Sequence, residues 1–206
     1  MFNLQTTDAV IRLGRLALDF GQINRITYHH DGVTPESDAD HTVMLGLIAC
    51  ALATQWFAGL RTGLVAQYAL VHDLCEVYAG DTPTLRELDP AARAGKKARE
   101  RAAYERIVRE FGHQFPWLPL TISSYEDEAT PEARFVRMLD KVLPKIAHLL
   151  NGAATIAAQG MTRAQVIARY QAQGRELDRY ADEFPEVEQL RTTLVERLVA
   201  QLDEVA

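Results

Sequence analysis

Three features that would each indicate a particular class of protein are scarce or absent in the sequence. Its 206 residues contain only two cysteines, no excess of basic residues and no long apolar run. The longest apolar stretch covers residues 43–53, whereas a membrane-spanning helix needs about 20 residues. We therefore expect no membrane span. The two cysteines lie within apolar segments, which favours buried free thiols over a disulfide framework.

The charge balance is acidic. The chain has 22 Lys and Arg against 28 Asp and Glu, a formal net charge of −6. Proteins that bind DNA or RNA usually carry a basic surface, so a nucleic-acid polymer is not an expected partner. Residues 1–5 lack the basic cluster and apolar run of a secretory signal, from which we expect a cytoplasmic protein. With 48% hydrophobic residues and no repeat, residues 1–206 are expected to form one domain.

Apolar residues recur at helical spacing over residues 10–20, 42–57 and 64–79, which predicts three helices. Further helix starts are indicated by a capping residue or an early proline at four places: Asp89-Pro90, Thr130-Pro131, Thr162 with Gln165, and Phe184-Pro185. Pro144 is expected to kink the helix that begins after Thr130. No convincing strand pattern is present. The predicted fold class is therefore all-α.

Charged residues stand in the most apolar helices. Between residues 64 and 80, the only ionisable side chains apart from two tyrosines and Cys75 are His72, Asp73 and Glu76. Their separations of three and four residues place them on adjoining parts of one helical surface. Burying them without compensation costs several kcal/mol or more, so they need partners.

Two further residues are predicted to join this polar site. His41 stands at the start of the apolar helix over residues 42–57, and Asp140 lies on the apolar face of the helix after Thr130. His41, His72, Asp73 and Asp140 would then converge, and two imidazoles with two carboxylates suit a divalent transition metal. The spacing alone is equally consistent with a buried His/Asp hydrogen-bond network that holds no metal.

The order His41, then His72-Asp73, then Asp140 resembles the H…HD…D signature of the HD-domain metal-dependent phosphohydrolases. Residues 72–83, HDLCEVYAGDTP, resemble the HDxxExxxGDxP block of the 5'-deoxynucleotidase and HD-domain-containing-protein branch. Ile23-Asn24-Arg25 resembles the arginine segment of that branch, and residues 131–141 resemble its EARFVxxLDK block. The resemblance spans roughly residues 12–150. Residues 151–206 carry no recognised motif and are expected to form supporting helices.

The resemblance implies a compact HD-domain helical bundle with one divalent metal ion (Mn, Co, Mg, Zn, Ni or Fe) bound by His41, His72, Asp73 and Asp140. It implies that Glu76 orients or deprotonates a metal-bound water. Asp81 would act near the phosphate and the leaving alcohol. Without the resemblance, Asp81 would be interpreted as a turn residue in a Gly-Asp-Thr-Pro segment.

The resemblance also implies substrate contacts. Arg25 matches a phosphate-binding arginine, and Thr82 and Thr84 fall in a stretch that contacts nucleotide in the relatives. The deoxynucleotidases have a Trp that packs where a 2'-hydroxyl would sit, whereas this chain has Ile26, so selectivity for deoxyribose is not implied.

Basic residues outside these motifs leave alternatives open. Lys141 and Lys145 follow Asp140, and either would bind additional phosphates if it reached the metal pocket; otherwise both lie on a solvated helix edge. The basic stretch over residues 93–109 is interleaved with glutamates, which favours a solvated helix.

The expected function is a metal-dependent phosphohydrolase that acts on a small-molecule nucleotide. The expected reaction converts (deoxy)nucleoside 5'-monophosphates to nucleoside and phosphate. One alternative is a deoxynucleoside triphosphate triphosphohydrolase, and another is a non-catalytic nucleotide-binding HD module. Because relatives are commonly oligomeric, a homodimer or larger homo-oligomer is also expected.

Overall fold

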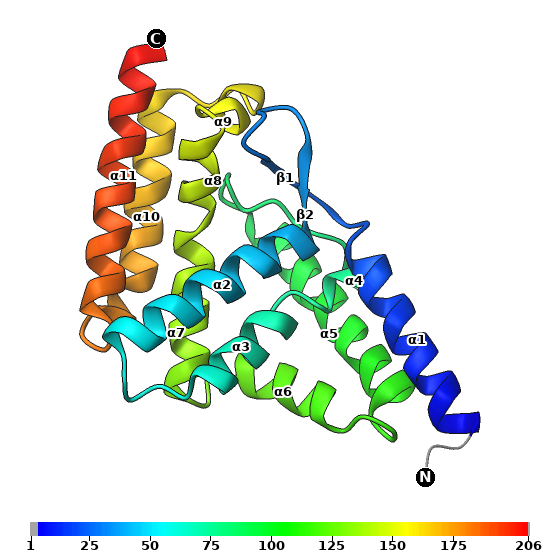
Figure 1. Cartoon of the computed structure of the whole chain (residues 1–206). Helices are drawn as coiled ribbons and strands as arrows, with labels where there is room; N and C mark the ends of the chain where they lie inside the picture. Colours follow the sequence, from blue (N-terminus) through cyan, green and yellow to red (C-terminus); the bar gives the residue numbers. More distant parts are fainter. Residues whose placement is uncertain (1–3, 206) are drawn as a thin grey trace.

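The computed structural model describes residues 4–205 and is all-α, as predicted (Figure 1). Its helices are α1 (Leu4–Phe20), α2 (Asp38–Trp56), α3 (Thr62–Val71), α4 (Glu76–Ala79), α5 (Pro90–Phe111), α6 (Trp117–Glu126), α7 (Pro131–Val142), α8 (Pro144–Leu150), α9 (Ala154–Ala158), α10 (Arg163–Ala181) and α11 (Pro185–Val205). A small sheet pairs β1 (Asn24–Tyr28) with β2 (Pro35–Ser37). Across residues 4–205, no helix combines the length and the apolar character needed to cross a membrane.

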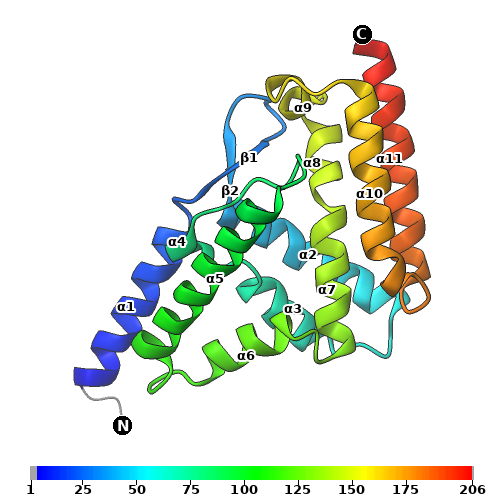
Figure 2. The same ribbon diagram turned by 180° about the vertical axis from the view of Figure 1, so that it is seen from behind.

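The main core lies where α2, α3 and α7 pack together. Leu45, Val65 and Phe135, one from each helix, are completely buried. The two most apolar helices are therefore central, as their composition predicts. Helices α10 and α11 lie side by side and pack against α7 and α8, on the opposite side of the molecule from α1 (Figures 1 and 2).

The predicted helix starts are confirmed. Asp89 and Thr130 cap α5 and α7 through their side chains, and each is followed by a proline in the first turn. Thr162 and Gln165 form the predicted capping box of α10. The kink expected at Pro144 is a junction, because α7 ends at Val142 and α8 begins at Pro144. These caps set where α5, α7 and α10 begin, and each of these helices carries residues that line a cavity at the candidate site.

Two details of the prediction are wrong. The chain contains an antiparallel hairpin, β1 with β2, although no strand was expected. Its strands have five and three residues, too short to show a clear alternation of polar and apolar residues.

The single helix predicted over residues 64–79 is also interrupted. It ends at Val71, and α4 begins at Glu76. Between them, Leu74 N donates to Val71 O at 3.1 Å and Glu76 N donates to Asp73 O at 2.8 Å. These tighter turns replace regular α-helix where tertiary contacts hold the charged side chains.

Candidate metal centre and adjoining cavities

The structure brings together the four predicted metal ligands from three parts of the chain. His41 lies in the first turn of α2, His72 and Asp73 lie in the turn after α3, and Asp140 lies near the end of α7. One ligand atom of each lies within 4.8 Å of those of the others. His41 Nε2 is 3.1 Å from Asp140 Oδ1, and His72 Nε2 is 2.9 Å from Asp73 Oδ2. Their role in binding a metal stays a prediction.

Local structure explains how the two histidines are held. A capping box between Ser37 and Asp40 starts α2 immediately before His41, and this fixes the direction of the first turn. The Nδ1 atom of His72 lies 2.8 Å from Ala69 O. This contact favours the tautomer with the proton on Nδ1, which directs the Nε2 lone pair at the other ligands.

The size and chemistry of the set fit a divalent metal. Ligands at about 2.0–2.2 Å from a metal lie at most about 4.4 Å from one another, and the four ligand atoms here all lie within 4.8 Å of one another. Within the described residues, His72 Nε2 and His41 Nδ1 are buried without a hydrogen-bond partner. The nearest carboxylate oxygen to His41 Nδ1 is Glu36 Oε1 at 3.9 Å, which is beyond hydrogen-bond distance.

The electrostatics of the set favour binding of a cation. Burial lowers the pKa of His41 and keeps its imidazole neutral. Burial alone would raise the pKa of Asp73 and of Asp140, but the charge of His72 beside Asp73 and of Lys141 beside Asp140 outweighs it, so both pKa values are lowered. Asp73 in turn raises the pKa of His72 against the effect of burial, so a metal would displace a proton from its Nε2 atom. The site therefore offers two carboxylates and a neutral imidazole, which are the forms that bind metals.

Arg25 on β1 connects this set with a second acidic group. Its Nη1 atom donates to Asp73 Oδ2 and to Asp38 Oδ1, both at 3.1 Å. Asp38, Glu76 and Asp81 each offer an oxygen atom within 4.8 Å of the others. Glu76 and Asp81, the two residues predicted to be catalytic, therefore lie in this second group beside the four predicted ligands.

The pKa values of all three carboxyl groups in the second acidic group are raised. Burial, together with the charge of Asp73, raises the pKa of Glu76 to about 10. Burial also raises the pKa of Asp81 and, with Asp73, raises that of Asp38 to about 6. The sequence interpretation missed Asp38, which is completely buried. Its position three residues before His41, on the same helical face, was the available signal.

A wide cavity of about 660 Å³ opens onto the metal-ligand set between α5 and α6. His72, Asp73 and Asp140 line it, and α5 supplies basic residues to it: Arg93, Lys96, Lys97 and Arg101. The prediction of a solvated helix holds for most of α5, yet one side of that helix borders the cavity. Because α5 lacks an apolar stripe, its sequence does not show which side that is.

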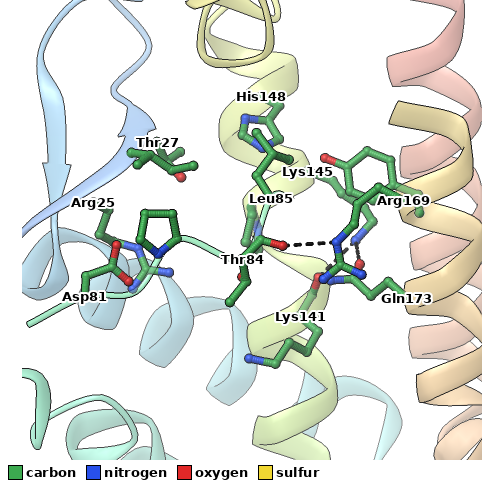
Figure 3. Close-up of a pocket in the computed structure, with 14 residues that line it drawn as sticks. Arg25, Thr27, Asp81, Thr84, Leu85, Lys141, Lys145, His148, Arg169 and Gln173 are labelled. Atoms are coloured by element: carbon green, nitrogen blue, oxygen red, sulfur yellow. Dashed lines mark hydrogen bonds between the residues drawn. The ribbon is translucent and has the colours of Figure 1, made fainter. Parts of the chain in front are cut away.

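A narrow cavity of about 60 Å³ lies on the other side of Lys141. Arg25, Ile26 and Thr84 line it, and α10 contributes Arg169, Tyr170 and Gln173, so residues 151–206 do more than support the bundle (Figure 3).

Two of the predicted substrate-binding residues differ in where they lie. Thr84 borders both cavities, whereas Thr82 is not among the lining residues of either. Its hydroxyl instead accepts a hydrogen bond from Arg99 at 2.9 Å.

The two lysines after Asp140 are also separated. Lys141 borders both cavities and its Nζ lies 2.7 Å from Asp140 Oδ2. Lys145 lines the narrow cavity but not the wide one. Neither lysine therefore lies on a purely solvated helix edge.

Comparisons with known proteins agree with the fold. A family model described as HD domain matches residues 21–181. The crystal structure of a protein described as a predicted metal-dependent phosphohydrolase, from Magnetospirillum magnetotacticum, is similar with 25% identity and a TM-score of 0.77, covering 98% of this chain and 97% of that one. No curated protein matches the chain significantly in sequence.

Two archaeal structures share the fold at lower similarity. One is a conserved hypothetical protein from Pyrococcus furiosus, with 20% identity and a TM-score of 0.54 over 88% of this chain and 99% of that one. The other is a protein from Pyrococcus horikoshii, with 20% identity and a TM-score of 0.55 over 87% of this chain and 99% of that one.

Proposed function

Since this chain belongs to the HD-domain family and resembles a metal-dependent phosphohydrolase, we propose that it removes phosphate from nucleotides, with (deoxy)nucleoside 5'-monophosphates as the simplest substrates. The observation that carries the proposal is the position of Arg25. Its guanidinium lies against Asp73 of the predicted ligand set and borders the narrow cavity. A phosphate bound between Arg25 and the predicted ligand set would contact the metal centre and the arginine together.

A divalent metal at His41, His72, Asp73 and Asp140 would supply an acidified water and polarise a phosphoryl oxygen. The protein residues supply proton handling and orientation. Glu76 is placed to hold a proton beside the reacting phosphate. Its pKa of about 10 falls towards neutrality when positive charge offsets Asp73. Asp81, in the same group, is placed to pass a proton to the leaving alcohol.

The wide cavity provides room for the nucleoside. Its volume of about 660 Å³ lies within the range of small-molecule sites. Tyr104, Ile122 and Tyr125 provide apolar lining, and the basic side chains of α5 border the same cavity. We place the base and sugar in this cavity, with the phosphate directed towards Arg25.

A screen of nucleoside mono-, di- and triphosphates with Mn²⁺, Co²⁺ and Mg²⁺ tests the proposal. Release of inorganic phosphate from dAMP is the expected result. Release of tripolyphosphate from a deoxynucleoside triphosphate would favour the triphosphohydrolase instead. Nucleotide binding with no product over the whole panel would identify a non-catalytic binding module and contradict the proposal.

The expected assembly and location also stay predictions. A homodimer or larger homo-oligomer is testable by sedimentation of the purified protein. The cytoplasmic location is testable by fractionation of cells that express the full chain.

A further inference from the structure

The narrow cavity has an unusual charge. It lies where β1, the loop after α4, α8 and α10 meet (Figure 3). Four cationic side chains line it, and the only carboxylate among its lining residues is Asp81. The four cations are Arg25, Lys141, Lys145 and Arg169.

Lys145 is the cation that most needs an explanation. Its side chain is completely buried, and its Nζ donates to Lys141 O at 2.9 Å and to the side chain of Gln173. No carboxylate among residues 4–203 forms an ion pair with it. Burial, with the charges of Arg191 and Arg169, lowers the pKa of Lys145 to about 7. A buried amine without an anionic partner is costly, so a bound anion would stabilise its charged form.

Further polar groups in the same cavity have no partner. Tyr170 and His148 are 4% and 2% exposed, and within the described residues the Tyr170 hydroxyl and His148 Nδ1 have no hydrogen-bond partner. Most buried polar groups in proteins are hydrogen-bonded. Arg169 donates from Nε to Thr84 O at 3.0 Å, while its Nη1 has only a 3.9 Å contact with the largely exposed Glu176. Its outer N–H groups therefore remain available to a ligand.

We propose that the narrow cavity binds a phosphoryl group, as a second anion subsite beside the metal centre. Its volume of about 60 Å³ is a small fraction of the roughly 660 Å³ of the wide cavity, which suits a small tetrahedral oxyanion better than a nucleobase. Lys145, Arg169, Tyr170 and His148 would contact the oxyanion.

The bound phosphate has two possible sources. Lys141, whose Nζ lies 2.7 Å from Asp140 Oδ2, borders both this cavity and the cavity that contains the predicted ligands. A nucleoside di- or triphosphate whose first phosphate lies at the metal centre would therefore direct a further phosphate into the cavity. This source rests on the proposed function. The other source is free inorganic phosphate, which requires only the cavity.

The first experiment measures anion binding by metal-free protein. Calorimetric titration with inorganic phosphate and with pyrophosphate compares the wild type with Lys145→Met and Arg169→Gln. Each variant should weaken binding by about tenfold or more, because each removes a charge-assisted hydrogen bond. Arg175→Gln is the matched control, since Arg175 is on the same helix and exposed but does not line this cavity. It should bind as the wild type does.

The second experiment compares kcat/KM for a nucleoside diphosphate with that for the matching monophosphate. If Lys145→Met lowers this ratio about tenfold, the substrate supplies the second phosphate. If the variant weakens phosphate binding and leaves the ratio unchanged, free phosphate is the ligand. Both results support the subsite.

The two proposals fail in different ways. If no nucleotide is hydrolysed while anion binding still depends on Lys145 and Arg169, the proposed function is wrong and the subsite stands. If the wild type binds neither anion, or if both variants bind as tightly as the wild type, the subsite is overturned whatever the protein hydrolyses. Because Lys145→Met tests a buried position, thermal unfolding establishes that each variant is folded before titration.

Discussion

The two cavities that Lys141 borders differ in size and in their balance of charge. The wide one, about 660 Å³, is lined by His72, Asp73 and Asp140 of the predicted metal site and by further basic and acidic side chains. The narrow one, about 60 Å³, is lined by four cations and one carboxylate. The predicted ligands in the first attract a cation, and the second attracts an anion. Together they suit a ligand that carries several phosphates and binds a divalent metal.

This contrast shows why net charge is a poor guide to small-molecule binding. The chain as a whole carries −6, which argues against a polyanionic polymer as partner. Locally, Arg25, Lys145 of α8 and Arg169 of α10 line one cavity, and they make the charge of that cavity positive. The separation of charge arises at the junction of α7 with α8, because Asp140 and Lys145 lie on either side of Pro144.

The largest effect on activity is expected when the predicted metal site loses one of its four ligands. Asp73→Ala removes a predicted metal ligand and the partner of Arg25, so metal binding and turnover should be lost together. Loss of more than about 100-fold is expected, since even partners outside the metal shell contribute 10–100-fold. Metal content and kcat/KM are the measurements. Asp178→Ala, at an exposed position on α10, is the control, and unchanged activity in Asp73→Ala would contradict the site.

A change at Glu76 should separate proton handling from metal binding. Glu76→Gln keeps the size of the side chain and removes its ability to exchange a proton. Turnover should fall by about 10²–10⁴-fold, whereas metal content should stay near that of the wild type because Glu76 lies outside the four-ligand set. Loss of the metal in this variant would show instead that Glu76 is a ligand.

The effect expected at Lys145 is smaller, about tenfold, and is confined to the narrow cavity. This variant separates the roles of the two cavities, because Lys145→Met changes the narrow cavity and leaves the acidic residues in place. A variant that lost metal together with anion binding would show that the two cavities act as one site.

The smallest effect is expected at a residue that serves only the scaffold. Glu132 ties α7 to the start of α3, since its Oε1 accepts hydrogen bonds from Arg61 N at 3.1 Å and Nε at 2.9 Å. Burial would raise the pKa of Glu132, but these hydrogen bonds lower it to about 2. Glu132→Gln should reduce the free energy of unfolding by about 1 kcal/mol at pH 7, with kcat unchanged.

The lowered pKa of Glu132 also predicts how the stability difference between wild type and Glu132→Gln changes with pH. A carboxyl whose pKa is lower in the folded state stabilises the fold above its unfolded pKa, and that stabilisation disappears as pH falls through the folded value. The difference in Tm between wild type and Glu132→Gln should therefore shrink below about pH 4.5 and vanish near pH 2. A difference in Tm that grew on acidification would contradict the lowered pKa of Glu132. Glu105→Gln, which breaks an exposed pair on α5, should leave Tm nearly unchanged at every pH.

Local signals predicted much of the fold. The caps at Asp89, Thr130 and Thr162 were correct because capping depends on residues three apart in the chain. The hairpin was missed because its strands are too short to show an alternating pattern, and the break after Val71 was missed because it depends on distant partners. Arg25 on β1, for example, contacts Asp73, 48 residues away.

From the sequence, the cost of burying charge indicated a polar site at His41, His72, Asp73 and Asp140, since it is a property of short segments. The resemblance to the H…HD…D signature favoured a metal site over a hydrogen-bond network. The packing of the helices, by contrast, brings Asp38 to Glu76 and Asp81, and brings Arg169 and Tyr170 of α10 to a cationic cavity beside them. Contacts between residues far apart in the chain depend on how helices pack, and no local pattern records that packing.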